Sequence, residues 1–176
     1  MTLFRWEVAG YVVAFSTRLG GVSSGPFTSL NLGRRSGDDV DNVDENRRRL
    51  CDSLGADVEK LTISYQTHSA VVRRARAGEK GEPGDGLWTD EPGVPLLALT
   101  ADCLPIALAR PDRSGLAVLH AGWRGLLAGI VEAGVSALGG GRLAAAVGPG
   151  IGPCCYEVGS EVAERFEPAL SRGRNL

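Results

Sequence analysis

Apolar residues recur along the chain with two different spacings, which predict strands in some segments and helices in others. Runs rich in β-branched and apolar residues predict six strands, over residues 11–18, 61–70, 94–101, 104–110, 115–121 and 143–149. The short polar stretch RPDRSG separates the fourth and fifth runs, which predicts a hairpin turn between them. Residues 19–33 and 75–86 are rich in glycine and polar residues, and the second of these segments is predicted to be an exposed loop.

Three segments predict helices because their apolar residues lie three or four positions apart: residues 41–56, 125–140 and 160–170. In the first, Val43, Arg47, Leu50 and Leu54 share one face. We expect Asn42 to cap its start, and Gly55 to end it. Strands and helices mix without strict alternation, which favours an α/β (α+β) sandwich. The expected architecture is one domain, with a mixed β-sheet and helices packed on its faces.

The composition is that of an ordinary soluble globular domain. The chain has 176 residues, of which 43% are apolar and 23% charged, and a net charge of −2. This charge gives no support to a nucleic-acid partner. No apolar run approaches the roughly 20 residues that a membrane span needs, and the first residues lack a signal-peptide pattern. We therefore expect a cytoplasmic protein with no membrane partner, whose four cysteines are free thiols or metal ligands.

The strongest chemical signal is one cysteine and the chain's only two histidines. His68, Cys103 and His120 each end an apolar run and precede a break, in QTHS, TADC-LP and LH-AGWRG. Taken singly, each residue is typical of a buried thiol or a hydrogen-bonded histidine. Residues at the same end of neighbouring strands converge, however, and one thiolate with two imidazoles suits Zn²⁺ or a copper ion. Three protein ligands leave a fourth position open, as in catalytic sites.

Two arginines and a cysteine pair lie near these motifs. Arg18 precedes a glycine-rich loop and Arg124 follows HAGW, so both could hold an anion such as phosphate. The alternative for Arg124 is stacking on a neighbouring ring. Cys154 and Cys155 are adjacent, and we expect their side chains to point to opposite sides, with at most one of them facing the site. A rigid loop with one buried thiol is the favoured interpretation of this segment, so Cys155 and Glu157 are weaker candidates for site residues.

The segments STRLGGVSSGPFTSLNLG, GDDVDNVDENRRRL, QTHS, TADCLPIAL, HAGWRG and GPGIGPCCYEVG together resemble the laccase-domain family. Members of this family were called multicopper polyphenol oxidases and were later assigned as purine nucleoside phosphorylases. The resemblance covers nearly the whole chain. It implies an α/β sandwich and a zinc ion held by one cysteine and two histidines, at positions that match His68, Cys103 and His120. It also implies phosphorolysis of adenosine, inosine and methylthioadenosine, with deamination of adenosine as a side activity.

The resemblance also sets an expectation for the extent of the domain, and we add our own hypothesis for the residues that contact the substrates. Family members continue through a further helix and strand, so we expect residues 1–176 to be a single domain that lacks the family's C-terminal segment. Arg18 and Arg124 would hold phosphate, Asn31 and Gln66 would make polar contacts, and Asp102 would orient a ligand or carry a proton. The partners would be a purine nucleoside and phosphate, and the protein would be a monomer or homodimer.

Other classes of function remain open at this point. One is a metal-free cysteine hydrolase or transferase, in which His120 activates Cys103. Another is a copper polyphenol oxidase, which the count of two histidines disfavours because coupled copper sites need many imidazoles. The last is a metal-dependent binding module without turnover.

Overall fold

The computed structural model describes residues 3–8 and 10–173, which form three β-sheets and four α-helices. The central sheet has five strands in the order β10 (Ala144–Val147), β8 (Leu104–Ala109), β9 (Leu116–Ala121), β6 (Gly86–Thr89) and β4 (Val72–Arg74). Only the β4–β6 pair in this sheet is parallel. The predicted hairpin between β8 and β9 is confirmed by their antiparallel register.

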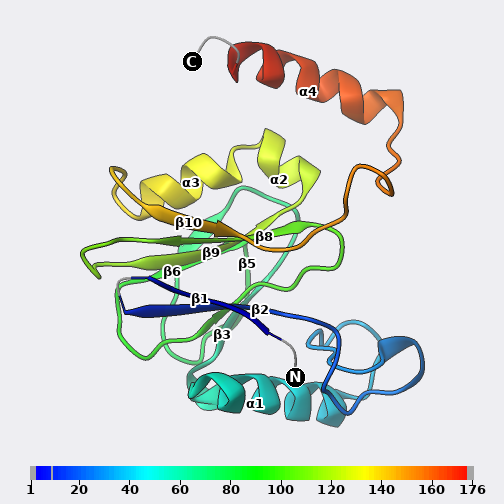
Figure 1. Cartoon of the computed structure of the whole chain (residues 1–176), viewed down its shortest axis with the longest axis vertical. Coiled ribbons are helices and arrows are strands. Elements are labelled where there is room, and N and C mark those ends of the chain that lie inside the picture. The colour runs from blue at the N-terminus through cyan, green and yellow to red at the C-terminus, as the bar shows by residue number, and fades with distance from the viewer. Residues whose placement is uncertain (1–2, 9, 174–176) are drawn as a thin grey trace.

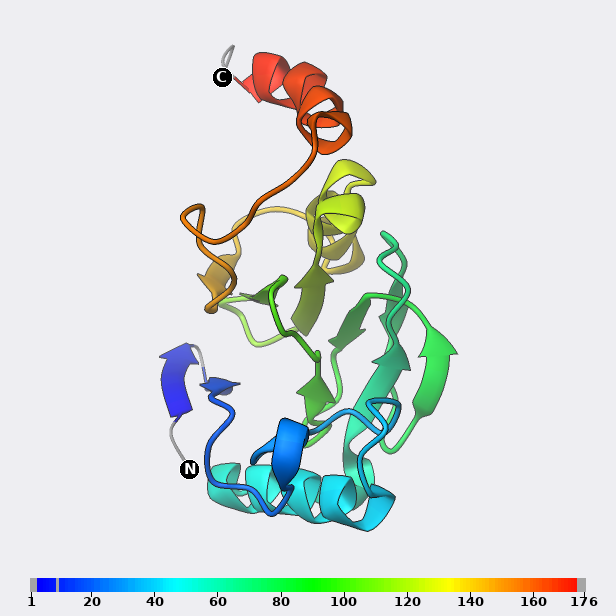
Figure 2. The same cartoon turned by 90° about the vertical axis from the view of Figure 1, so that its right-hand side faces the viewer.

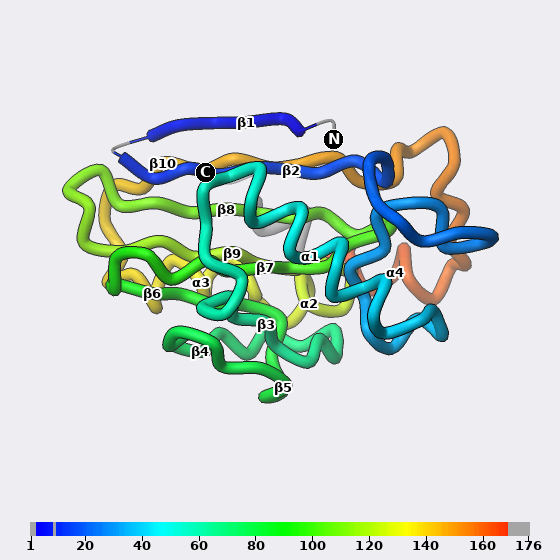
Figure 3. The backbone as a smooth tube through the Cα atoms, turned by 90° about the horizontal axis from the view of Figure 1, so that it is seen from below, coloured from blue at the N-terminus to red at the C-terminus, as the bar shows by residue number. Residues whose placement is uncertain are grey.

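Two smaller sheets lie beside the central one. A parallel sheet has the order β5 (Lys80–Pro83), β3 (Thr62–Tyr65) and β7 (Leu96–Leu97). An antiparallel hairpin joins β1 (Leu3–Val8) to β2 (Tyr11–Ser16). Seen from below, this hairpin runs alongside β8 and β10 (Figure 3).

Helices lie on both sides of the sheets, as predicted (Figure 1). The short α2 (Trp123–Leu127) and α3 (Ile130–Ala137) cover one face of the central sheet, and α1 (Val40–Leu54) lies at the opposite end of the molecule. The last helix, α4 (Ser160–Gly173), lies beyond α2 at the end of a long connection (Figure 2). Short 3₁₀ turns occupy Gly25–Phe27 and Val58–Lys60. The expected α/β sandwich with mixed sheets is therefore confirmed. No helix in the described part of the chain is long and apolar enough to cross a bilayer.

The main core lies between the central sheet and α3. Ile106, Leu119 and Ile130 belong to one cluster of buried apolar side chains, and Leu119 and Ile130 are fully buried. Close approach of α3 to β9 requires a glycine at position 134, because a Cβ there would lie 2.8 Å from a methyl carbon of Leu119. This packing holds β9, and so the end of the strand that carries His120, in a fixed position.

The first helix packs through polar as well as apolar residues. Val43 and Asn46 are completely buried on its inner face. Its cap differs from the prediction, because Asp39 and not Asn42 precedes the first turn, and the Asp39 carboxylate accepts a hydrogen bond from the amide of Asp41. Gly55 ends the helix with φ +67°, as predicted, in the left-handed conformation that glycine adopts readily.

The sequence prediction differs from the structure in four further places. Residues 75–86 are not simply a loop, because β5 lies within them and β6 begins at Gly86. The predicted helix over 125–140 is two helices, since Gly129 with φ +87° interrupts it. The strands predicted over 61–70 and 94–101 contract to β3 and β7. Strands β1 and β4 were not predicted at all.

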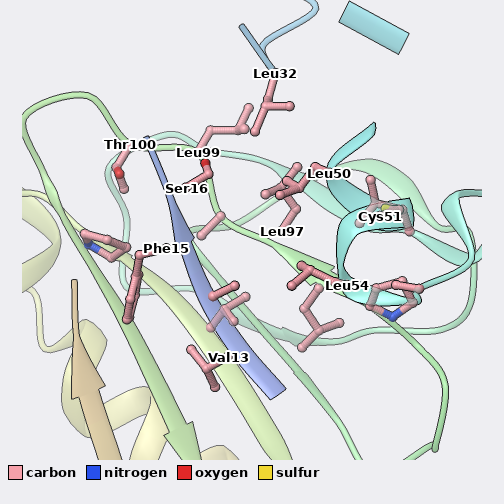
Figure 4. Close-up of a pocket in the computed structure, with 18 of the residues that line it drawn as sticks. Val13, Phe15, Ser16, Leu32, Leu50, Cys51, Leu54, Leu97, Leu99 and Thr100 are labelled. Atoms are coloured by element: carbon pink, nitrogen blue, oxygen red, sulfur yellow. The ribbon is translucent and has the colours of Figure 1, made fainter. Parts of the chain in front are cut away.

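A cleft of about 1430 Å³ lies between α1, β2, β7 and β8 (Figure 4). Its walls are mostly apolar, and Val13, Phe15, Leu50 and Leu97 are among the side chains that line it. Pro105 and Val118, which also line it, lie on the same face of the central sheet as His120, because alternate strand residues share a face. The cleft therefore runs along the face that carries His120 at one end.

Candidate metal centre

The three residues that the sequence predicted as metal ligands lie together. The ligand atoms of His68, Cys103 and His120 are all within 4.8 Å of one another. His120 lies near the end of β9 and Cys103 immediately precedes β8, and the pairing of Leu104 with Ala121 brings these two segments side by side. His68 comes from the turn that follows β3. The predicted convergence of these residues is confirmed, and no other group of this kind occurs among the described residues.

A buried carboxylate, Asp85, organises both histidines. One of its oxygens accepts a hydrogen bond from the amide of His68 (3.0 Å) and lies 2.8 Å from Nδ1 of His120. The other accepts from the amides of Thr67 (3.0 Å) and Ser69 (2.7 Å) and from the Ser69 hydroxyl (2.8 Å). The Asp85 side chain is fully buried. Asp85 therefore fixes the turn that carries one imidazole and the ring of the other.

This arrangement suits a metal ligand set. Because Asp85 occupies Nδ1 of His120, the remaining Nε2 is the nitrogen available to an ion, and a carboxylate behind the ring is the usual partner of a metal-bound histidine. His68 has φ +60°, a left-handed conformation that costs free energy in a residue other than glycine. The hydrogen bond from its amide to Asp85 helps to hold that conformation. The donor set and its supports thus fit a metal ion.

The protonation states of Asp85 and Cys103 follow from their surroundings. Burial alone would raise the pKa of Asp85, but hydrogen bonds from His120 and Ser69 outweigh it and lower this pKa to about 2. Asp85 is therefore ionised at neutral pH. Burial raises the pKa of the Cys103 thiol, and the negative charges of Asp102 and Asp85 raise it further. Without a cation beside it, Cys103 therefore remains a thiol at neutral pH.

Space at the centre depends on Gly122, directly after β9. A Cβ at this position would lie 2.9 Å from Cδ2 of His68 and 3.0 Å from Sγ of Cys103. Both distances are too short for unstrained contacts. Gly122, in HAGWRG, thus leaves room for the side chains of His68 and Cys103.

Three predicted contact residues make hydrogen bonds within the protein: Arg18 and Asn31 inside the loop between β2 and α1, and Gln66 to a separate segment. The guanidinium of Arg18 donates two hydrogen bonds to the carbonyl of Thr28, at 2.8 and 2.6 Å. The Asn31 amide donates to side chains of the loop before α1. Gln66 exchanges two hydrogen bonds with the backbone of Leu99. Arg18 and Asn31 line the apolar cleft, and Gln66 lies two residues before His68.

The other two predicted residues lie close to the ligands in sequence. Arg124 stacks on Trp123, with its guanidinium carbon 4.3 Å from the ring centroid, which is the stacking alternative considered from the sequence. Arg165 of α4 approaches the same ring at 5.7 Å. Asp102 is exposed beside Cys103, and its carbonyl accepts a hydrogen bond from the amide of Ile151.

The weaker candidates lie outside the donor group. Cys155 and Glu157 are exposed on the loop between β10 and α4. The expectation that vicinal cysteines point apart is wrong here, because the Sγ atoms of Cys154 and Cys155 lie 3.2 Å from each other. The loop turns at this point, with the amides of Cys155 and Tyr156 both donating to the carbonyl of Gly152, and so brings the two thiols to one side.

Asp85 is the functional residue that sequence reasoning missed. It lies in the glycine-rich GEPGDG stretch, which was predicted to be an exposed loop. The available signal was a single acid flanked by glycines and followed directly by the strand-like GLWT. Its partners are 16 to 18 and 35 residues away in sequence, so its role depends on contacts that local patterns do not reveal.

The chain is similar in sequence to known proteins over most of its length. The family described as multi-copper polyphenol oxidoreductase laccase matches residues 12–175. Purine nucleoside phosphorylase YlmD of Geobacillus stearothermophilus is 38% identical over 178 residues, covering 92% of this chain and 65% of its own. Purine nucleoside phosphorylase YfiH of Escherichia coli is 40% identical over 170 residues, covering 92% of this chain and 68% of its own.

Solved structures share the fold. The crystal structure of YlmD from Geobacillus stearothermophilus superposes with a TM-score of 0.82 at 37% identity, over 87% of this chain and 63% of that one. A Neisseria meningitidis protein superposes with a TM-score of 0.87 at 29% identity, over 98% of this chain and 73% of that one. The chain thus spans about two thirds of the length of these relatives.

Proposed function

Since the chain belongs to the multi-copper polyphenol oxidoreductase laccase family, and its relatives are named purine nucleoside phosphorylases, we propose that it is a metal-dependent purine nucleoside phosphorylase. The observation that carries this proposal is the donor group of His68, Cys103 and His120, with Asp85 behind it. The substrates would be a purine nucleoside such as adenosine, inosine or methylthioadenosine, together with phosphate.

Zinc is the proposed metal. One thiolate and two imidazoles match the ligands of catalytic zinc sites, which keep a fourth position open. A coupled multicopper centre needs many more imidazoles than the two histidines of this chain. When bound, zinc would supply a Lewis acid that polarises a substrate oxygen or nitrogen, or a water molecule.

The proposed reaction forms a bond between phosphate and C1′ of the ribose while the bond from C1′ to the purine breaks. The purine leaves with the electron pair, and the second product is ribose 1-phosphate. We assign Arg18 and Arg124 to phosphate, which they would contact after leaving their present partners, Thr28 and the ring of Trp123. Asp102, exposed beside Cys103, would carry a proton to the leaving base or orient a ligand.

Two polar side chains complete the proposed site. Gln66, which is held by the backbone of Leu99, and Asn31 would contact the nucleoside. Deamination of adenosine is proposed as a side activity of the same centre, because a metal Lewis acid also serves attack by water on a purine ring carbon.

A metal-free cysteine enzyme is the less favoured alternative. It would need Cys103 as a thiolate activated by His120. Burial and two neighbouring carboxylates instead raise the pKa of Cys103, which favours the neutral thiol in the absence of a cation. His120 already directs Nδ1 to Asp85. The chemistry of both residues is better matched to binding a cation.

Product analysis tests the proposal. The zinc-loaded protein is incubated with adenosine in the presence and absence of phosphate, and the products are separated by chromatography. We expect adenine and ribose 1-phosphate only with phosphate, and inosine at a slower rate in both mixtures. A Cys103→Ser variant should form none of these products, whereas Cys51→Ala, altered in a buried thiol of α1, should retain them. A zinc-loaded protein that releases no base from any purine nucleoside would contradict the proposed activity.

A further inference from the structure

The adjacent cysteines after β10 form a surface feature that the metal centre does not use. Cys154 and Cys155 are both exposed, on the loop that connects β10 to α4. Their sulfur atoms lie 3.2 Å apart, although neighbouring side chains usually point in opposite directions. Neither belongs to the donor group of the metal centre.

We propose that Cys154 and Cys155 form a reversible dithiol–disulfide pair that reacts with hydroperoxides. The first argument is access. Among the four cysteines, Cys51 is buried with 3% exposure, and Cys103 is half-buried within the metal donor group. The only exposed thiols are these two, so an oxidant in solution meets them first.

The second argument is the presence of a resolving thiol. A single oxidised cysteine stops at the sulfenic acid or proceeds to sulfinic and sulfonic acids, which are not reduced by ordinary thiols. A second thiol within contact distance intercepts the sulfenic acid and forms a disulfide instead. At 3.2 Å, the sulfur of Cys155 is close enough to the sulfur of Cys154 to do this.

The local contacts assign a role to each sulfur. The contact with the sulfur of Cys154, at 3.2 Å, raises the pKa of Cys155, which favours the protonated form of Cys155. Cys155 is then assigned as the resolving thiol, and Cys154 is the sulfur that reacts first. It attacks one oxygen of the hydroperoxide, the O–O bond breaks, and the other oxygen leaves as an alcohol or water after taking a proton. Cys154 is thereby oxidised to a sulfenic acid.

The second step closes the ring. The sulfur of Cys155 attacks the sulfur of the Cys154 sulfenic acid, the S–O bond breaks, and the hydroxide leaves as water with the proton of Cys155. Two thiols have then lost two electrons and two protons to one hydroperoxide. A disulfide between neighbours closes a small strained ring, and strained, exposed disulfides are easily reduced by other thiols. The pair should therefore be open under reducing conditions and close only during exposure to peroxide.

Peptide mapping of the full, zinc-loaded chain tests the proposal. After brief treatment with hydrogen peroxide, we expect the peptide that contains both cysteines to lose two hydrogens and to resist alkylation, and reduced glutathione to restore it. In a Cys155→Ser variant, Cys154 should be trapped as a sulfenic acid by dimedone and should accumulate about tenfold more sulfinic acid than in the wild type. Cys51→Ala is the matched control and should behave as the wild type.

Two results would overturn the proposal. One is a wild-type peptide in which both thiols remain free for alkylation while Cys103 or Cys51 is oxidised. The other is sulfinic acid at Cys154 in equal amounts in the wild type and the Cys155→Ser variant, since this would mean that Cys155 does not intercept the intermediate.

Discussion

Asp85 contacts the backbone of the turn that carries one histidine ligand and the ring of the other, so its carboxylate couples the positions of His68 and His120. Hydrogen bonds from His120 and Ser69 hold the pKa of this carboxylate at about 2 against the effect of burial, so its charge is maintained. Loss of such a neighbour typically costs about 10- to 100-fold in metal affinity or activity. At the residue scale, the proposed metal centre therefore depends on one acid that is not itself a ligand.

The Asp85→Asn variant tests this role. An asparagine has nearly the same shape, but its NH₂ group faces donors where the carboxylate accepted hydrogen bonds, and the fixed charge behind His120 is lost. We expect zinc affinity to fall about 10- to 100-fold, measured by competition with a chromophoric chelator. Asp90→Asn, at an exposed residue paired with Arg74, is the control and should bind zinc as the wild type does. Unchanged affinity in Asp85→Asn would refute the assigned role.

The affinity for zinc is expected to increase with pH. Because the pKa of Cys103 is raised by burial and by Asp102, the metal-free centre carries a proton on this sulfur at neutral pH, and zinc must displace it. Affinity should therefore increase as pH rises, about tenfold per pH unit for one proton. The apparent dissociation constant for zinc, measured at several pH values, checks this; a constant independent of pH would contradict it.

Sequence reasoning found the three proposed ligands but not the carboxylate that supports them. His68, Cys103 and His120 stand out because each ends an apolar run, and the sheet then brings such ends together. Asp85 has no such local mark, and its hydrogen bonds reach across the turn and the sheet. Likewise, the pairing of Gln66 with Leu99 spans 33 residues and is invisible in a local pattern.

At the scale of elements, α1 holds the long loop before it through one buried amide. The Asn46 side chain accepts a hydrogen bond from the amide of Val22 and donates to Ser23 Oγ and to the carbonyls of Ser29 and Asn31. Such a residue stabilises a whole loop, because its loss removes hydrogen bonds to four different loop residues at once.

Replacement of Asn46 by alanine should therefore destabilise the fold by about 2–4 kcal/mol, measured by urea unfolding. Asn42→Ala, one turn earlier on the same helix, should change stability by less than about 0.5 kcal/mol, since Asp39 and not Asn42 provides the cap. Equal effects of the two substitutions would contradict the assignment of the loop contacts to Asn46.

The elements themselves were predicted unevenly. The strands β8 and β9 have continuous apolar runs, and they were placed within one residue of their observed bounds. The strand β5 has the sequence KGEP and is exposed along its length, so it owes its conformation to pairing with β3 and not to its own pattern. Helices α2 and α3 share one apolar pattern, but Gly129 separates them because its left-handed backbone cannot continue a helix.

At the scale of the whole molecule, the metal centre joins three segments that lie far apart in the sequence. The turn after β3, the residue before β8 and the end of β9 meet only in the folded chain. An ion that binds all three ligands stabilises the native state, because the unfolded chain offers no such site. The ion would therefore tie the turn after β3, near the smaller parallel sheet, to the central sheet.

Zinc should accordingly raise the melting temperature of the protein. With free zinc at about 100 times its dissociation constant, the added stability is about 2.7 kcal/mol. Thermal unfolding with and without zinc measures this increment. The Cys103→Ser variant should show a much smaller increase, and an equal increase in both proteins would mean that zinc acts elsewhere on the chain.

The most direct test of the central claim is the number of zinc ions that stay bound to each chain after dialysis against a weak chelator, measured by elemental analysis. If one metal centre is formed by His68, Cys103 and His120, the wild type should hold one zinc per chain. A Cys154→Ala/Cys155→Ala double variant should hold the same amount. The Cys103→Ser variant should hold almost no zinc. If Cys103→Ser retains one tightly held zinc per chain, or if the wild type holds none under conditions in which it is folded, the claim is wrong.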